Sequence, residues 1–328
     1  MPAGTLYRGR EGMWSWVAHR VTGVLIFFFL FVHVLDTALV RVSPDAYDKV
    51  VDRLPGFQMY DAWVTREMTV RDLLVHRSGL GLGAGDLMFV PRSKRTRAQM
   101  LEGLKHIKPA TSFRGGYAYD NILYTVAGAL IEAVSGQAYE SYVRDHVYKP
   151  AGLLTATSDE PSRLATVNRA YPHGRIDGPV RGLGHQQLLD ERDQLGAAST
   201  PAGLLAMSAN DLAKWLTIQL AHGKTSDGRR LFSEASSATM WQPQTLEPNP
   251  PAPPGFEATQ SMFKTYALGW EVSDYGGAKI ISHSGGVFGF ITMVVLIPER
   301  NVGFAITMNA EESAVRRGLT YELIDHYL

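Results

Sequence analysis

The stretch that decides the fold is FRGGYAYDNILYTVAGALIEAVSGQ, residues 113–137. From Ile122 onward its apolar residues recur at helical spacing, and Gly136 closes the run. The polar triplet Tyr119-Asp120-Asn121 therefore lies at the start of a buried helix. Aromatic residues in front of a helix usually only pack, so the triplet indicates chemistry only in combination with other motifs.

The composition excludes several classes of function. The 328 residues carry a formal net charge of zero, which gives no reason to expect a nucleic-acid partner. The chain has no cysteine, so disulfides, thiolate catalysis and Cys-ligated metals are excluded. The sequence predicts no cofactor and no metal site.

A long apolar run near the N-terminus predicts a membrane span. It is VTGVLIFFFLFVHVLDTALV, residues 21–40, with one acidic side chain. As a helix rising about 1.5 Å per residue it spans about 30 Å, the thickness of bilayer hydrocarbon. Its Val, Leu, Ile and Phe residues contribute roughly −4 to −8 kcal/mol to insertion, against about +3 kcal/mol for Asp36. We therefore expect a transmembrane helix here rather than a buried core helix or a cleaved signal peptide.

The first forty-eight residues also carry a family resemblance. The order MWSW…HR…G…FFFLFVHVLD within residues 4–48 resembles the first membrane segment of the actinobacterial succinate dehydrogenase cytochrome b subunit. The resemblance implies a quinone-pocket border at Ser15, His19 and Arg20. It also implies a cytoplasmic N-terminus, a following domain outside the cytoplasmic membrane, and respiratory-complex subunits as candidate partners. The family's two further membrane helices do not occur in this sequence.

The composition changes after Asp48, and residues 49–328 are expected to form a separate domain. Helices are predicted over residues 69–79, 97–107, 122–135, 139–147, 208–222, 233–241 and 311–328, with a polar loop over 158–195. The segment 247–260 is Pro-rich and extended. The short β-rich runs YALGWEVS, KIISHS, FGFITMVVLIP and VGFAITMN then predict an antiparallel meander.

Residues from about 50 to 328 closely resemble the class C β-lactamase and D-alanyl-D-alanine carboxypeptidase-like serine hydrolases. The matching segments, in order, are LPGF (54–57), MTVRDLLVHRSGL (68–80), Tyr119-Asp120-Asn121, KPAGL (149–153), RLFSEA (230–235), YALGW (266–270) and HSGGVFGF (283–290). The implied fold class is α/β (α+β), a β-lactamase/transpeptidase-like fold with an antiparallel sheet, flanking helices and a helical region. It would be N-terminally truncated and preceded by one transmembrane helix.

The resemblance also implies site residues. Tyr119 would assist proton transfer, and Asn121 would bind the substrate amide. His283 stands where the family usually has a lysine, and with Gly285 it would complete the catalytic set at the start of an edge strand. Ser284 and Gly286 would bind substrate, the Gly286 N–H as one oxyanion donor.

The family's first motif, Ser-x-x-Lys, has no counterpart in the expected place. The apolar segment stands there, without serine or lysine, and the chain's single Ser-x-x-Lys is Ser261–Lys264, in the wrong order and element. Without that lysine, a phenol of ordinary pKa is ionised in about one molecule per thousand at pH 7. Without a nucleophile no acyl-enzyme forms. The missing segment would also leave the strand at 302–309 with an open edge.

Three interpretations follow. The first is a chimera of a succinate dehydrogenase membrane segment and a truncated, inactive serine hydrolase. The second is an active membrane-anchored hydrolase that uses another serine, such as Ser261 or one from a partner chain. The third is non-catalytic, either a respiratory-complex anchor or a peptidoglycan-binding pseudoenzyme. A β-lactam, a D-Ala peptide and a small ester all remain candidate substrates, because this family serves all three with one cleft.

Overall fold

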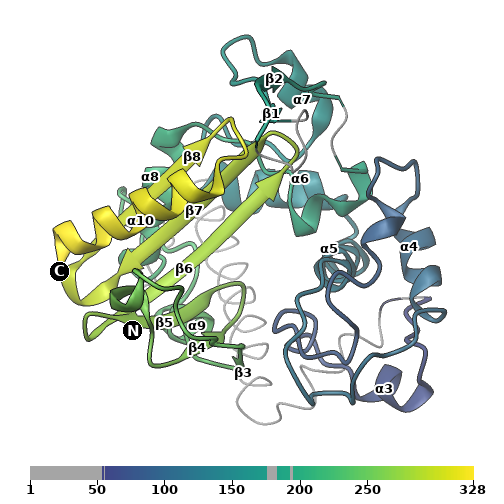
Figure 1. The fold of residues 1–328 in the computed structure, drawn as a ribbon. Coiled ribbons are helices and arrows are strands. Elements are labelled where there is room, and N and C mark those ends of the chain that lie inside the picture. Colours follow the sequence, from purple (N-terminus) through teal and green to yellow (C-terminus); the bar gives the residue numbers. More distant parts are fainter. Residues whose placement is uncertain (1–53, 55, 176–182, 193–194) are drawn as a thin grey trace, which may run out of the picture. The chain divides into compact units, whose positions relative to one another are not determined.

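The computed structural model describes residue 54 and residues 56–175, 183–192 and 195–328 (Figure 1). All of them belong to one compact unit, Val51–Leu328. The predicted transmembrane helix over residues 21–40 lies outside these ranges. Within them, no helix combines the length and the apolar character needed to cross a bilayer.

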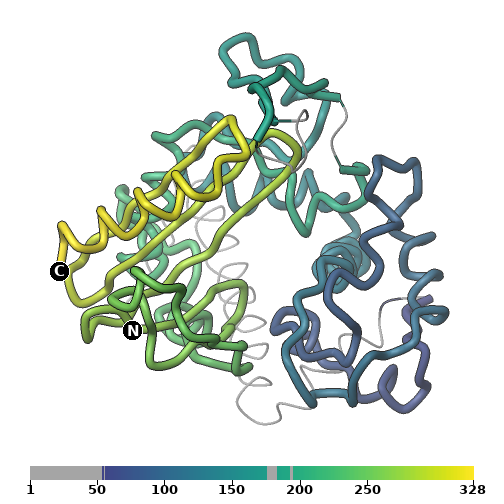
Figure 2. Tube along the Cα trace, in the orientation of Figure 1, coloured from purple at the N-terminus to yellow at the C-terminus, as the bar shows by residue number. Residues whose placement is uncertain are grey.

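Helices and turns make up most of the described chain before the large sheet begins (Figure 2). The α-helices are α3 (Ala62–Glu67), α4 (Arg97–Leu104), α5 (Ile122–Ser135), α6 (Tyr139–Val143), α7 (Glu160–Ala165), α8 (Ala209–Leu220), α9 (Glu234–Met240) and α10 (Ser313–Tyr327). A π-helical turn, Arg144–Tyr148, continues α6. Short 3₁₀ turns lie at Asp86–Met88, Ala197–Ala202, Glu257–Thr259 and Pro298–Arg300.

The predicted helices begin and end where the local chemistry requires. Helix α5 begins at Ile122, as predicted, and ends at Gly136, whose φ of 69° is the left-handed conformation that glycine adopts without cost. The side chains of Ser208 and Ser233 accept backbone N–H bonds and cap α8 and α9. These helices confirm the sequence prediction to within two residues at each end.

Two predictions in the helical part are wrong. Residues 69–79 form turns rather than a helix. Thr69 and Asp72 bond as at a helix start, the Thr69 N–H to Asp72 Oδ2 at 3.1 Å and the Asp72 N–H to Thr69 Oγ1 at 3.2 Å. The turns do not continue as a helix, because His76 has a positive φ of 54° that no helix tolerates. The predicted loop over 158–195 contains α7 and a two-stranded ribbon, β1 (His173–Arg175) and β2 (Gln186–Leu188).

The large sheet is antiparallel, in the order β3-β4-β5-β6-β7-β8, which confirms the predicted meander. Its strands are β3 (Thr245–Leu246), β4 (Lys264–Tyr266), β5 (Glu271–Tyr275), β6 (Ala278–Val287), β7 (Phe290–Ile297) and β8 (Val302–Met308). Among the strands that the structure describes, β8 pairs only with β7 and ends the sheet.

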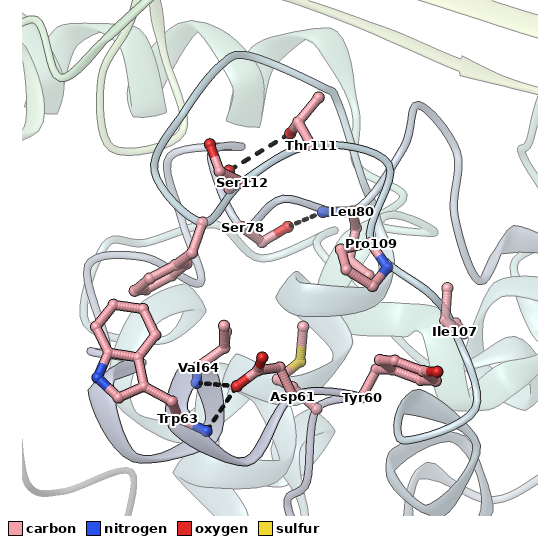
Figure 3. A pocket seen from close by; sticks show the side chains of 12 residues that line it. Tyr60, Asp61, Trp63, Val64, Ser78, Leu80, Ile107, Pro109, Thr111 and Ser112 are labelled. Carbon is pink, nitrogen blue, oxygen red and sulfur yellow. Dashed lines mark hydrogen bonds between the residues drawn. The ribbon is translucent and has the colours of Figure 1, made fainter.

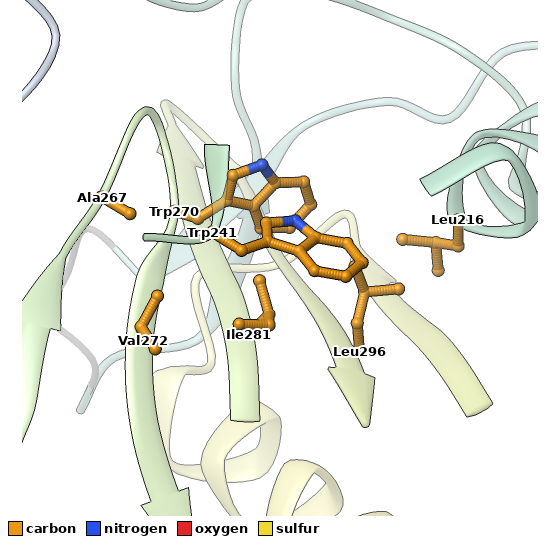
Figure 4. Packing of buried hydrophobic residues seen from close by; sticks show 7 residues of the cluster. All are labelled: Leu216, Trp241, Ala267, Trp270, Val272, Ile281 and Leu296. Atoms are coloured by element: carbon orange, nitrogen blue, oxygen red, sulfur yellow. The ribbon is translucent and has the colours of Figure 1, made fainter. Parts of the chain in front are cut away.

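Alternate residues of the central strands pack against opposite layers of helices. On one face, Leu296 lies in a cluster with Trp241, Trp270 and Leu216 of α8 (Figure 4). On the other face, Val295 packs with Ile324 of α10, which runs along β7 and β8 (Figure 1). This alternation is the period-two pattern of a sheet buried on both sides.

Candidate functional site

The structure brings two of the predicted motifs close together. Tyr119, just before α5, and His283, in β6, have ring centroids 6.3 Å apart. The Gly83 N–H, in the Gly-rich loop, donates to the Tyr119 carbonyl at 2.8 Å and so fixes the backbone at Tyr119. The Tyr-x-Asn and His-Ser-Gly motifs therefore face the same region, although they come from the helical part and the sheet.

A buried histidine packs beside Tyr119. The ring of His76 is 1% exposed, and its centroid lies 4.1 Å from that of Tyr119 and 4.5 Å from that of Tyr266. Burial, and secondarily the nearby His283, lowers the His76 pKa to about 3, so the ring is neutral at physiological pH. Its Nδ1 accepts the Asp120 N–H at 3.2 Å. His76 therefore acts here as an aromatic packing element rather than as a cation.

Asn121 lies beside a carboxylate. Its Nδ2 is 3.3 Å from both Oδ1 and Oδ2 of Asp86, a residue of the turn that follows the Gly-rich loop. Burial raises the Asp86 pKa, and the Asn121 amide partly opposes the shift. The two motifs meet through Tyr119, whose ring lies near His283, while Asn121 bonds to Asp86.

The predicted substrate-binding segment lies inside β6 rather than at the start of a strand, which corrects the expectation. Strand β5 pairs with β6 only as far as Glu271 opposite Ser282, whereas β7 pairs with β6 along to Val287. From His283 onward, β6 thus has one edge without a partner among the described strands. Ser284, Gly285 and Gly286 are exposed there. A Cβ at Gly285 would lie 2.4 Å from Thr292 Oγ1, so the cross-strand neighbour requires a glycine.

The surroundings of Tyr119 keep its hydroxyl protonated. Burial, with Glu271, Asp120 and Asp86 as negative neighbours, raises the Tyr119 pKa to about 12. At pH 7 such a phenol is ionised in about one molecule per 100,000. The Tyr119 hydroxyl is therefore protonated at pH 7 and can donate a hydrogen bond.

Ser261, the serine of the single Ser-x-x-Lys motif, lies away from His283 along the strands. The backbone N–H groups of Met262 and Phe263 donate to the Asp274 carboxylate, at 2.8 and 3.1 Å. Asp274 pairs with Lys279, four residues before His283 on β6. At about 3.3 Å per residue those four residues cover about 13 Å. The structure therefore does not bring Ser261 to the Tyr119–His283 pair.

A separate cavity of about 200 Å³ lies on the helical part (Figure 3). Trp63 stands on one side of it and Ile107 on the other. Phe113 also lines the cavity, and its ring centroid lies 5.9 Å from that of Trp63. Ser78 also lines it and donates to Asp120 Oδ2 at 3.2 Å. Neither Tyr119 nor His283 lines this cavity.

Three aromatic residues that pack around Tyr119 were not singled out from the sequence: His76, Tyr124 and Tyr266. The ring centroid of Tyr124 lies 5.4 Å from that of His76. His76 and Tyr266 belong to the quoted segments LLVHRSGL and YALGW, where they are consistent with ordinary core packing. The one feature that could have indicated a role in the site was a polar aromatic side chain within an otherwise apolar run. Among the described residues, no group of three or more His, Asp or Glu could hold a metal ion.

An antiparallel sheet between helical layers, with a Tyr-x-Asn motif facing a His-Ser-Gly strand, defines the penicillin-recognising class of serine hydrolases. The family model described as Beta-lactamase matches residues 39–328, and the chain therefore belongs to the β-lactamase family. A second model, the succinate dehydrogenase/fumarate reductase transmembrane subunit, matches residues 1–68.

Curated relatives also match either the β-lactamase-family part or the N-terminal part of the chain. "Unguisins hydrolase ungD'" of Aspergillus campestris is 27% identical over 284 residues, 83% of this chain and 48% of its own length. "Penicillin-binding protein 4" of Amycolatopsis lactamdurans is 26% identical over 80% of this chain and 64% of its own. The chain thus spans about half to two thirds of these relatives. "Succinate dehydrogenase 2 membrane subunit SdhC" of Mycobacterium tuberculosis is 66% identical over 50 residues, 15% of this chain and 37% of its own.

Solved structures share the fold. The octameric penicillin-binding protein homologue from Pyrococcus abyssi matches with a TM-score of 0.65 and 20% identity, over 85% of this chain and 60% of that one. A D-stereospecific amidohydrolase from Streptomyces sp. matches with a TM-score of 0.60 and 19% identity, over 84% and 77%. The β-lactamase/penicillin-binding-protein fold, an antiparallel sheet with flanking helices, is thus confirmed.

Proposed function

We propose that this chain is a β-lactamase-family domain that keeps part of the substrate site, at Tyr119, Asn121 and His283–Gly286, but forms no acyl-enzyme. The observation that carries the proposal is the placement of Ser261–Lys264. Asp274 holds the chain next to Ser261, away from His283 along the strands. A serine there cannot attack a substrate bound beside Tyr119.

The charges near Tyr119 support the same proposal. A nucleophilic serine in this chemistry needs a nearby base, and a phenol serves as one only when a cation lowers its pKa. Burial, and secondarily the carboxylates of Glu271, Asp120 and Asp86, raise the Tyr119 pKa, which is the opposite direction. The domain is therefore suited to binding a small-molecule or peptidoglycan-like ligand rather than to turning it over.

Hydrolysis assays test the proposal. The full chain in detergent would be incubated with a chromogenic cephalosporin, a D-Ala-D-Ala peptide and a nitrophenyl ester, with Tyr119→Phe as the matched control. We expect the same background rate from both proteins and from heat-denatured samples. Turnover that the wild type shows and Tyr119→Phe loses would contradict the proposal and favour a serine supplied from elsewhere.

The succinate dehydrogenase similarity supports a second element of the function. We propose that residues 1–48 form a single-pass membrane anchor with its span at 21–40, and that residues 49–328 lie outside the cytoplasmic membrane. The 66% identity to a membrane subunit over 50 residues favours this. If the segment also docks on respiratory subunits, succinate dehydrogenase subunits should copurify with the chain. Their absence would restrict the segment to anchoring.

We also propose that the two parts were joined as a chimera near residue 48. Sequencing the genomic DNA across the codons for residues 40–60 tests this. An uninterrupted reading frame supports a genuine fusion. Two separate intact genes would show that the join is an artefact of assembly.

A further inference from the structure

Both ring nitrogens of His283 are engaged within the protein. Nδ1 lies 2.6 Å from the Ser284 carbonyl oxygen. A carbonyl oxygen has no hydrogen to donate, so Nδ1 must carry the proton of this bond. In the neutral ring, Nε2 is then an acceptor with a free lone pair.

The hydroxyl of Tyr266 meets that lone pair. It lies 3.0 Å from His283 Nε2 and 3.5 Å from the Tyr124 hydroxyl. Tyr124 donates its own hydrogen to the Leu74 carbonyl, at 2.8 Å. The shorter distance makes His283 the better acceptor for the Tyr266 hydrogen. When His283 is neutral, each hydrogen therefore has one acceptor. The Nδ1 hydrogen goes to the Ser284 carbonyl, the Tyr266 hydrogen to His283 Nε2, and the Tyr124 hydrogen to the Leu74 carbonyl.

Packing fixes Tyr266 in this position. Its side chain is 1% exposed, and its ring lies against His76, whose centroid is 4.5 Å away. Its backbone is held in β4 by pairing with Thr245 on one side and Glu271 on the other. The ring can neither turn to solvent nor shift along the strand without breaking the sheet, so its hydroxyl is a preorganised donor.

We propose that Tyr266 is a positioning residue of the candidate site, which holds His283 as the Nδ1–H tautomer with its Nε2 directed into the protein. This inference rests on the proposed ligand site but not on its lack of turnover. With both nitrogens engaged, the imidazole has no donor for a ligand carboxylate. Recognition along β6 then depends on the exposed backbone and on Ser284. The histidine is thus no functional replacement for the lysine that the family usually has there.

Nitrogen NMR of the full chain reads the tautomer directly. At about pH 8, where an ordinary histidine is neutral, the long-range ¹H–¹⁵N pattern of His283 should show Nδ1 protonated and Nε2 bare. Tyr266→Phe leaves the Nδ1–H form favoured by the Ser284 carbonyl but no longer by a donor at Nε2, so the share of the Nε2–H form should rise. The matched control is Tyr275→Phe on the adjacent strand β5, whose hydroxyl donates to Asp325 at 2.6 Å, and it should leave the pattern unchanged. An Nε2–H wild type, or an unaltered Tyr266→Phe spectrum, overturns the proposal.

Chemical modification gives an independent readout. Diethyl pyrocarbonate attacks a free imidazole lone pair. In Tyr266→Phe either tautomer of His283 leaves one ring nitrogen with a lone pair that accepts no hydrogen bond from Tyr266 or Ser284, so acylation of His283, followed by peptide mass, should be several-fold faster than in the wild type. Tyr275→Phe should react at the wild-type rate. Equal rates in all three proteins overturn the proposal. Substrate turnover would instead contradict the proposed lack of activity while leaving these results unchanged, so the two failures are distinguishable.

Discussion

At the residue scale, Asp120 of the Tyr119-Asp120-Asn121 triplet is a buried acid with an incomplete set of partners. Its side chain is 0% exposed, Oδ2 accepts the Ser78 hydroxyl hydrogen, and Oδ1 has no partner. Burial raises the Asp120 pKa from 3.8 to about 7, against the opposing bonds from Ser78 and the Leu123 backbone. The folded protein therefore favours the protonated acid.

This shift fixes the sign of a pH dependence. Because the native pKa of Asp120 lies above the unfolded one, the unfolded chain loses this proton first, and the contribution of Asp120 to the free energy of unfolding falls as pH rises from about 4 to about 7. Asp120→Asn cannot ionise, so its stability relative to wild type should improve across that window. Urea unfolding at several pH values measures the difference. Parallel curves for the two proteins would contradict it.

The sequence predicted the residues of the Tyr119–His283 pair but not how they are held. Tyr119, Asn121 and His283 were recognisable because motif order survives in the chain. The positive φ of His76 and its stacking on Tyr119 depend on tertiary packing, which residue spacing does not encode. The bond between Tyr266 and His283 joins strands that are not adjacent in the sheet order, so no local pattern reports it.

At the element scale, two helical glycines predict opposite effects of the same substitution. A Cβ at Gly128 in α5 would lie 2.1 Å from Pro201 Cγ, whereas a Cβ at Gly318 in α10 would meet nothing within 4 Å. Gly128→Ala should destabilise the domain by about 1–3 kcal/mol through overpacking. Gly318→Ala should stabilise it by about 0.5–1 kcal/mol through helix propensity.

Chemical unfolding of both glycine variants beside the wild type measures these effects. The Gly318 variant is the matched control, because it makes the same chemical change in an exposed helix interior. Stabilisation by Gly128→Ala would show that α5 and the Ala197–Ala202 turn do not pack as the structure has them.

The elements that were predicted correctly have start and stop residues within their own local sequence. Helices α5, α8 and α9 have a cap or a terminal glycine, and the strands of the meander are β-rich runs between turn residues. The helix predicted over residues 69–79 did not form, although Thr69 bonds to Asp72 as a cap does. The positive φ of His76 ends the turns there, and residue spacing does not report it.

At the scale of the whole molecule, the proposed anchor predicts how the chain partitions. Two arginines in the middle of residues 21–40, Phe28→Arg with Leu30→Arg, should cost about 6–8 kcal/mol of insertion free energy, which cancels the apolar gain. We expect this variant to leave the carbonate-resistant membrane fraction. The matched control exchanges the two residues, Phe28→Leu with Leu30→Phe, and should stay there. Retention of the double-arginine variant would contradict a span at this position.

We propose that this recognisable β-lactamase-family site forms no acyl-enzyme. The intact mass of the full chain, after incubation with a penicillin and, separately, with a fluorophosphonate, measures acylation directly. We predict an unchanged mass with both reagents. A stoichiometric adduct that maps to one serine, and that is lost when the serine is replaced by alanine, would show instead that the site acylates.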